Sequence, residues 1–213
     1  EATKIMPSEL KKHLIQKARD YRLPVITATQ MLDSMTRNPR PTRAEASDVA
    51  NAVLDGVDAV MLSGETAVGK FPAETCRTMR EIIHETEKGL FHDSWRLRPN
   101  LQPTGKKGQV LESATMDSAV TLAERAQART LLAFTESGRS VRLVSAFRAR
   151  LPIVALTSRE ETFQQMALYW GVMPGRLPRV KRIREMNREA HRLVRKHKLL
   201  GDQDLLVVVT GTF

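Results

Sequence analysis

The feature that most constrains the fold is an alternation of short strand-like segments with amphipathic helical segments along most of the chain. The segments at 25–29, 58–62 and 130–134 are dominated by apolar and β-branched residues, without polar alternation. Runs of this kind are typical of parallel strands buried on both faces, and the helical segments between them supply the crossovers that parallel strands need. The sequence therefore predicts an α/β protein.

The first 88 residues are predicted to alternate helix, strand, helix, strand and helix. Thr42 is followed three residues later by Glu45, which is the spacing of a capping box at a helix start. Gly56 follows the apolar positions of that helix and is expected near its end. The predicted elements are a helix at 8–22, a strand at 25–29, a helix from Thr42 to about Gly56, a strand at 58–62 and a helix at 72–88.

Residues 89–110 are predicted to be a linker, because proline and glycine occur there among basic residues. The alternation then resumes over 111–213, which we expect to be a compact open α/β sheet. The predicted helices are 111–127, 139–148, 160–168 and 182–198, and the predicted strands are 130–134, 153–156, 172–173 and 205–209. Both ends of the chain are expected to be incomplete, since residues 1–88 hold only two clear strands.

Composition narrows the class of protein further. The 41% hydrophobic and 27% charged residues are ordinary for a folded domain, and no apolar run approaches the roughly 20 residues of a membrane span. The net charge of +10 indicates an anionic partner: nucleic acid, acidic lipid or a phosphorylated small molecule. The basic helix at 182–198 has an apolar stripe and no interleaved aromatic residues, which favours a solvated surface over a nucleic-acid platform.

Hydroxyl and carboxyl groups follow the first two predicted strands. Thr29 ends one strand, and Ser63 and Glu65 follow the other. The carboxyl ends of parallel strands lie on the same edge of a sheet, where hydroxyls and a carboxylate can relay a proton or orient an anionic substrate. The alternative is that these hydroxyls cap the next helix. A near match to a phosphate loop at 64–71 has Phe71 where the Mg²⁺-binding Ser or Thr belongs, so we do not expect nucleotide hydrolysis there.

A third polar group lies where the strand at 130–134 meets the next helix. Its residues are Thr135, Ser137, Gly138, Arg139 and Ser140. Backbone N–H groups at a helix start, with hydroxyls and an arginine nearby, form a phosphate site. A plain serine-capped helix that needs no ligand accounts for the pattern equally well.

The chain resembles the pyruvate kinase family. The resemblance is carried by long blocks of consecutive residues in the first part and by shorter ones in the second. These blocks are residues 25–35, 41–45, 47–53, 55–58, 61–67, 135–140, 155–157 and 171–172.

The resemblance implies a partial (β/α)₈ TIM barrel followed by an open α/β domain. Residues 1–88 correspond to the last strands of the catalytic barrel, 89–110 to a linker, and 111–213 to the C-terminal effector-binding domain without its last strand. The residues that hold the metal ions of the family are expected to lie outside this chain.

The implied activity is phosphoryl transfer from phosphoenolpyruvate to ADP, giving pyruvate and ATP in glycolysis, with Mg²⁺ and K⁺ as cofactors of the complete enzyme. Thr29, Ser63 and Glu65 match residues on the proton route. A loop that holds the phosphate of a sugar-phosphate or AMP effector is matched by Ser137, Gly138, Arg139 and Ser140. Arg43 and Asp48 match a helix used between subunits of a homo-oligomer, a tetramer in the complete enzyme. A cytoplasmic location, with no nucleic-acid or membrane partner, is expected.

The chain alone is expected to be inactive, because the metal-binding carboxylates fall outside it. Two other functions stay open. The first is a non-catalytic regulatory module that binds a phosphorylated effector through Arg139 and its neighbours. The second is a basic nucleic-acid binder.

Overall fold

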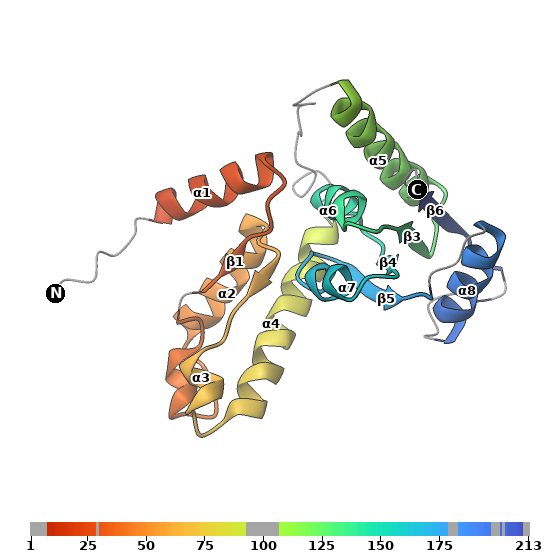
Figure 1. Cartoon of the computed structure of the whole chain (residues 1–213). Helices are drawn as coiled ribbons and strands as arrows, with labels where there is room; N and C mark the ends of the chain where they lie inside the picture. Colours follow the sequence, from red (N-terminus) through yellow and green to blue (C-terminus); the bar gives the residue numbers. More distant parts are fainter. Residues whose placement is uncertain are drawn as a thin grey trace. The chain divides into compact units, whose positions relative to one another are not determined.

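A computed structural model describes residues 8–28, 30–92, 107–178, 183–196, 201 and 203–210. The chain divides into two compact units, Glu1–Arg98 and Pro99–Phe213 (Figure 1). None of the helices in the described ranges is both long enough and apolar enough to cross a membrane.

The first unit holds two short parallel strands and the helices around them. Its elements are α1 (Ser8–Asp20), β1 (Ile26–Thr27), the 3-10 helix η1 (Asp33–Thr36), α2 (Arg43–Asp55), β2 (Ala59–Val60), α3 (Gly64–Ala67) and α4 (Pro72–His92). Ile26 pairs with Ala59, and Thr27 with Val60. Both strands are shorter than predicted. At their start, the carboxylate of Asp58 accepts from the Val25 amide at 2.8 Å, so a side chain takes the place of a ladder partner.

Helix α2 begins and ends where the sequence predicted. The hydroxyl of Thr42 accepts from the Glu45 amide and the Glu45 carboxylate accepts from the Thr42 amide, which completes the capping box. Gly56 ends the helix with φ +85°, a conformation that favours glycine. The guanidinium of Arg19 covers this end and donates to the Asp55 carbonyl at 3.2 Å, so a positive charge lies at the C-terminus of the helix.

The core of the first unit lies between α1, α2, α4 and the segment that follows β1. Its buried residues are Ile15, Met31, Leu32, Met35, Val49, Ala52, Val57 and Met79. The short helices η1 and α3, of four residues each, were not predicted from sequence. One turn is too short to show a helical period, and both segments are fixed by contacts with each other rather than by local pattern.

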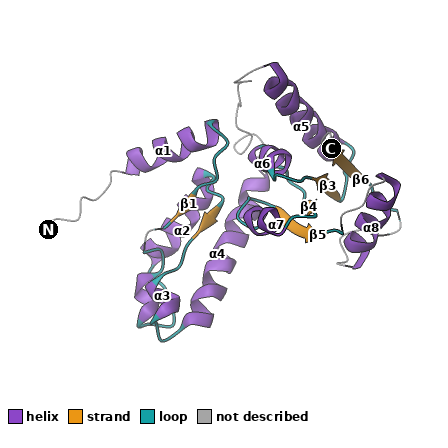
Figure 2. Ribbon diagram, viewed as in Figure 1, coloured by secondary structure: helices purple, strands orange, loops and turns teal. Residues whose placement is uncertain are grey.

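The second unit is a four-stranded parallel sheet covered on both faces (Figure 2). Its elements are α5 (Lys107–Arg125), β3 (Thr130–Phe134), α6 (Arg139–Ala146), β4 (Ile153–Thr157), α7 (Glu160–Met166), β5 (Val172–Arg176), α8 (Ile183–Lys196) and β6 (Leu206–Thr210). The strand order is β5-β4-β3-β6. Strand β5 is longer than predicted and contains Pro174, which an edge strand tolerates because one side needs no ladder hydrogen bond.

Successive residues of β3 and β4 point to opposite faces of the sheet. Leu131, Ala133 and Ile153 pack with residues of α5, α6 and α7. Leu132 and Phe134 pack with α8, on the other face. Both strands are buried at every position, as the uninterrupted apolar runs predicted.

The predicted linker at 89–110 is partly helical. Helix α4 extends to His92 and α5 begins at Lys107, so each helix reaches about four residues into that range. The remaining linker residues lie outside the described part of the chain.

Candidate functional site

The carboxyl ends of β1 and β2 lie side by side. The Met61 amide, just after β2, donates to the Thr27 carbonyl at 2.9 Å. The loops that follow the two strands therefore start from the same edge, as expected for parallel strands. Thr29 belongs to the first of these loops and lies outside the described residues.

The second loop carries Ser63 and Glu65, which contact each other. The Ser63 amide donates to Oε2 of Glu65 at 2.8 Å, and the Leu32 amide donates to Oε1 at 3.2 Å. The Glu65 side chain is 1% exposed. A single buried carboxylate thus links the loop after β1 to the loop after β2.

The environment of Glu65 keeps it ionised. Burial by itself raises the pKa of this carboxyl, but bonds from backbone N–H groups, those of Ser63 and Leu32 among them, outweigh burial and hold the pKa below its usual value. At neutral pH the group is a fixed negative charge whose oxygens are occupied by donors. It can orient its neighbours, and it is a poor proton donor.

The hydroxyl of Ser63 is placed differently. Ser63 precedes α3 as its N-cap residue, yet its side chain makes no capping hydrogen bond, and the residue is exposed. The alternative that this hydroxyl caps the next helix is therefore wrong for Ser63. The group is accessible for contact with a ligand.

The loop after β3 is held by its own hydroxyl and by α7. The Gly138 amide donates to Oγ1 of Thr135 at 2.9 Å, and Oγ1 of Thr162 donates to the Glu136 carbonyl at 2.7 Å. Gly138 has φ +77° and is the N-cap of α6, without a side-chain capping bond. The serine-capped helix considered from sequence is therefore wrong: glycine opens this helix.

The strand order places this loop at a switch point. From β3 the chain passes to β4 on one side, whereas β6, the other neighbour of β3, is reached through α8 on the opposite face of the sheet. Crevices that bind ligands in open α/β sheets form at the carboxyl ends of strands at such a point. Thr135 directly follows β3 there.

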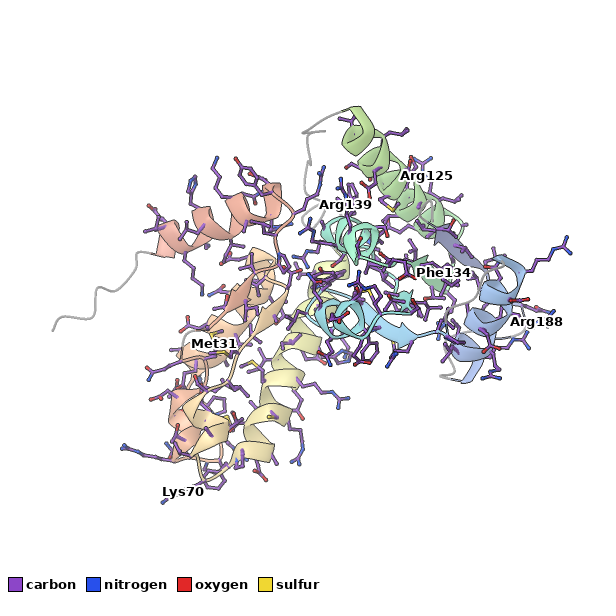
Figure 3. All side chains as sticks on the ribbon, in the orientation of Figure 1. Met31, Lys70, Arg125, Phe134, Arg139 and Arg188 are labelled. Carbon is purple, nitrogen blue, oxygen red and sulfur yellow. The ribbon has the colours of Figure 1, made fainter. Side chains whose placement is uncertain are left out.

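The charged groups of this loop are already engaged. Nε of Arg139 lies 2.9 Å from Oε2 of Glu112 on α5, and about half of the Arg139 side chain is exposed (Figure 3). The Glu136 carboxylate accepts from the Ser158 hydroxyl at 3.0 Å. Ser137 is exposed and Ser140 is buried. A phosphate would meet one arginine that is ion-paired and one nearby carboxylate.

The other predicted positions are surface residues. Arg43 and Asp48 are exposed on α2. Arg188 is exposed on α8 (Figure 3), while Ala190 and Val194 of the same helix are buried against the sheet. Among the described residues, no group of three His, Cys, Asp or Glu side chains converges as a metal site would require.

Sequence reasoning missed one partner of Glu65 and one role of Glu45. Leu32 supplies a backbone amide, which no side-chain pattern reveals. Glu45 was identified only as half of a capping box, yet it also accepts from the amide and the hydroxyl of Ser34. The sequence signal for this second role of Glu45 is its place in the capping box, because the glutamate of such a box faces the loop that precedes its helix.

These features define an α/β protein with two parallel-strand units, one with a serine–carboxylate pair at its strand ends and one with a loop at a sheet switch point. Residues 2–76 match the family model "Pyruvate kinase, barrel domain", and residues 113–213 match "Pyruvate kinase, alpha/beta domain". The chain belongs to the pyruvate kinase family. Its first unit is a fragment of the barrel domain and its second unit is the α/β domain.

Relatives match nearly all of this chain but less than half of their own length. The pyruvate kinase of Corynebacterium glutamicum is 44% identical over 204 residues, which cover 95% of this chain and 41% of the relative. That of Geobacillus stearothermophilus is 43% identical over 203 residues, covering 95% and 34%. A crystal structure of a pyruvate kinase from Cryptosporidium parvum matches with a TM-score of 0.85 and 33% identity, covering 97% of this chain and 42% of that one.

Proposed function

We propose that the chain contributes the last barrel strands and the regulatory domain of a pyruvate kinase, which transfers phosphoryl from phosphoenolpyruvate to ADP and yields pyruvate and ATP. The observation that carries the proposal is the Ser63–Glu65 pair at the carboxyl ends of β1 and β2. In a (β/α)₈ barrel the active site lies at this end of the strands.

The pair fits the second half of the reaction. When the phosphoryl group has left phosphoenolpyruvate, the remaining enolate needs a proton on its terminal carbon. The exposed hydroxyl of Ser63 would pass on such a proton. Thr29 would act with it, as the family resemblance implies. Glu65 is the fixed carboxylate that holds the Ser63 backbone in place.

Mg²⁺ and K⁺ would offset the negative charge of phosphoryl transfer in the complete enzyme. The described residues do not fit such a site: no three potential ligands converge, and both oxygens of the Glu65 carboxylate accept from backbone amides. We expect the chain alone to be inactive, because the metal-binding carboxylates of the family fall outside it.

A coupled assay with lactate dehydrogenase tests inactivity directly. The purified chain should form pyruvate no faster than its Thr29→Val variant. Turnover clearly above that control would overturn the expected inactivity.

A chimera tests the catalytic role. This chain replaces the matching segment of the pyruvate kinase from Geobacillus stearothermophilus, which supplies the remaining barrel. The chimera should be active, and Ser63→Ala should lower kcat by roughly 100-fold with a smaller change in KM. A folded, tetrameric chimera whose activity is unaffected by Ser63→Ala would contradict the proposal.

A regulatory module is the second candidate, favoured by the switch-point loop and the glycine N-cap of α6. Residues Thr135, Ser137, Gly138, Arg139 and Ser140 would surround the phosphate of a sugar phosphate or AMP. Calorimetry on the 213-residue chain tests this. Absence of binding, or binding unchanged by Arg139→Ala, would remove the candidate.

Assembly and location follow from the same proposal. A homo-oligomer, a tetramer in the complete enzyme, would use Arg43 and Asp48, which are exposed and therefore available for subunit contacts. A cytoplasmic location is proposed because the substrates belong to glycolysis.

A further inference from the structure

Glu45 makes more contacts than a helix cap requires. Its carboxylate accepts from the amide and the hydroxyl of Thr42, which complete the cap of α2. It also accepts from the Ser34 amide at 2.7 Å and from the Ser34 hydroxyl at 2.5 Å. The second pair of bonds adds nothing to the cap, because Ser34 lies in η1, outside α2.

The segment that Glu45 holds is the same one that supplies a donor to Glu65. Ser34 and Leu32 are two residues apart, and the Leu32 amide donates to the Glu65 carboxylate. Leu32 is fully buried, as are its neighbours Met31 and Met35. The segment therefore has little freedom to move its amide independently of the bonds at Ser34.

The far end of η1 is fixed against the turn after α3. The Lys70 amide donates to the Thr36 carbonyl at 2.9 Å, and the Lys70 side chain extends from this turn (Figure 3). A Cβ placed on Gly69 would lie 3.3 Å from Cα of Thr36, which shows how closely the two backbones approach. One side of η1 thus contacts the loop that carries Glu65, and Glu45 holds the other.

We propose that Glu45 is a positioning residue for the Ser63–Glu65 pair, acting through Ser34 and the backbone of η1 to hold the Leu32 amide against the Glu65 carboxylate. The inference rests on the proposed function for its purpose, since the pair it positions is the proposed proton-handling group. The effect of Glu45 on the Leu32 amide can be measured without an activity assay.

Amide hydrogen exchange, followed by NMR on the 213-residue chain, tests the role. Glu45→Gln replaces one acceptor oxygen by an NH₂ group, which cannot accept from the Ser34 donors. The segment around η1 is then held less tightly, so the Leu32 amide should exchange with solvent about tenfold faster. The Cδ chemical shift of Glu65 at neutral pH should move with it. Ser34→Ala removes only the hydroxyl bond and should give a smaller effect in the same direction.

Two variants separate positioning from loss of stability. Thr42→Ala weakens the cap of α2 but leaves the Ser34 bonds, so exchange at Leu32 should stay within about twofold of wild type. Glu81→Gln is the matched control, because Glu81 is an exposed glutamate on α4. Equal exchange at Leu32 in Glu45→Gln and Glu81→Gln would overturn the inference, and so would an equal effect of Thr42→Ala and Glu45→Gln. If the chimera is inactive while the Leu32 amide stays protected from exchange, the proposed function is rejected and the positioning role of Glu45 is not.

Discussion

Arg139, at the start of α6, forms an ion pair with Glu112 of α5, with 2.9 Å between Nε and Oε2. About half of the Arg139 side chain is exposed. Surface ion pairs of this kind contribute about 0–1 kcal/mol, so a phosphate with two negative charges can compete for the arginine. In the proposed effector site, the pair would therefore lower the affinity for a phosphate without preventing its binding.

Replacing Glu112 by Gln should strengthen effector binding, because Arg139 no longer has a competing carboxylate. We expect the Kd for a sugar phosphate or AMP to fall by about two- to fivefold, the equivalent of roughly 0.4–1 kcal/mol. Isothermal titration calorimetry at low ionic strength is the measurement. An unchanged Kd in Glu112→Gln would show that Arg139 does not contact the phosphate.

Gly69 should not tolerate a side chain. A Cβ there would lie 2.2 Å from the Glu65 carbonyl oxygen, which belongs to the backbone and cannot rotate away. Gly69→Ala should therefore destabilise the first unit by about 1–3 kcal/mol. Hydrogen exchange in η1 and α3 should rise accordingly.

Gly89→Ala provides the control for that substitution. Gly89 lies in α4, and a Cβ there would meet nothing within 4 Å. Alanine favours a helix by about 0.5–1 kcal/mol over glycine, so this variant should be slightly more stable than wild type. Equal effects of the two substitutions would contradict the close contact between Gly69 and the Glu65 carbonyl.

Acid should loosen the Glu65 loop. The pKa of Glu65 in the folded protein lies below the value of 4.5 expected for a free glutamate. The ionised carboxylate therefore stabilises the fold fully above that pH, and the contribution disappears as the pH falls through the lowered pKa. Exchange at Leu32, corrected for its intrinsic pH dependence, should rise below about pH 4.5 in wild type.

In Glu65→Gln the same loop should be less protected at neutral pH but should depend less on pH, since the titrating group is gone. Glu45 has a lowered pKa as well: burial raises it, and bonds from Ser34 and Thr42 outweigh that effect. A residual acid response in Glu65→Gln should therefore disappear when Glu45→Gln is added. An acid response equal to that of wild type in the double variant would refute the assignment.

Substitutions on the two faces of helix α8 should differ strongly in their effect on stability. Val194 is 1% exposed and packs under the sheet, so Val194→Asp buries an unpaired charge and should destabilise the second unit by more than about 3 kcal/mol. Arg188 is exposed, and Arg188→Ala should change stability by less than about 0.5 kcal/mol. Urea denaturation followed by tryptophan fluorescence compares the two variants. A large effect of Arg188→Ala would show that the basic face is structural.

Local pattern was sufficient wherever a residue's role depends on its neighbours in sequence. The capping box of Thr42 and Glu45 lies within one helical turn, and the structure confirms it. The strand at 130–134 was predicted with its observed bounds, because an uninterrupted apolar run is buried on both faces of a parallel sheet. The predicted α/β class is also confirmed, because buried apolar runs of this kind indicate parallel strands.

Edges and short elements were less predictable. Strand β5 extends through Pro174 and Gly175, which local propensity excludes from a strand, because its position at the edge of the sheet removes the usual penalty. The roles of Thr29 and of the residues around Arg139 stay predictions.

The sequence by itself determined the alternation of strands and helices, the capping of α2 and the presence of hydroxyl and carboxyl groups at strand ends. Only the tertiary structure decided that Glu65 accepts from Leu32, 33 residues away, and that Glu45 accepts from Ser34, 11 residues away. It also placed β6 beside β3 rather than beside β5. In each of these bonds the donor is a backbone N–H group, which every residue except proline possesses, so the packing of the elements and not residue type decides which amide a carboxylate meets.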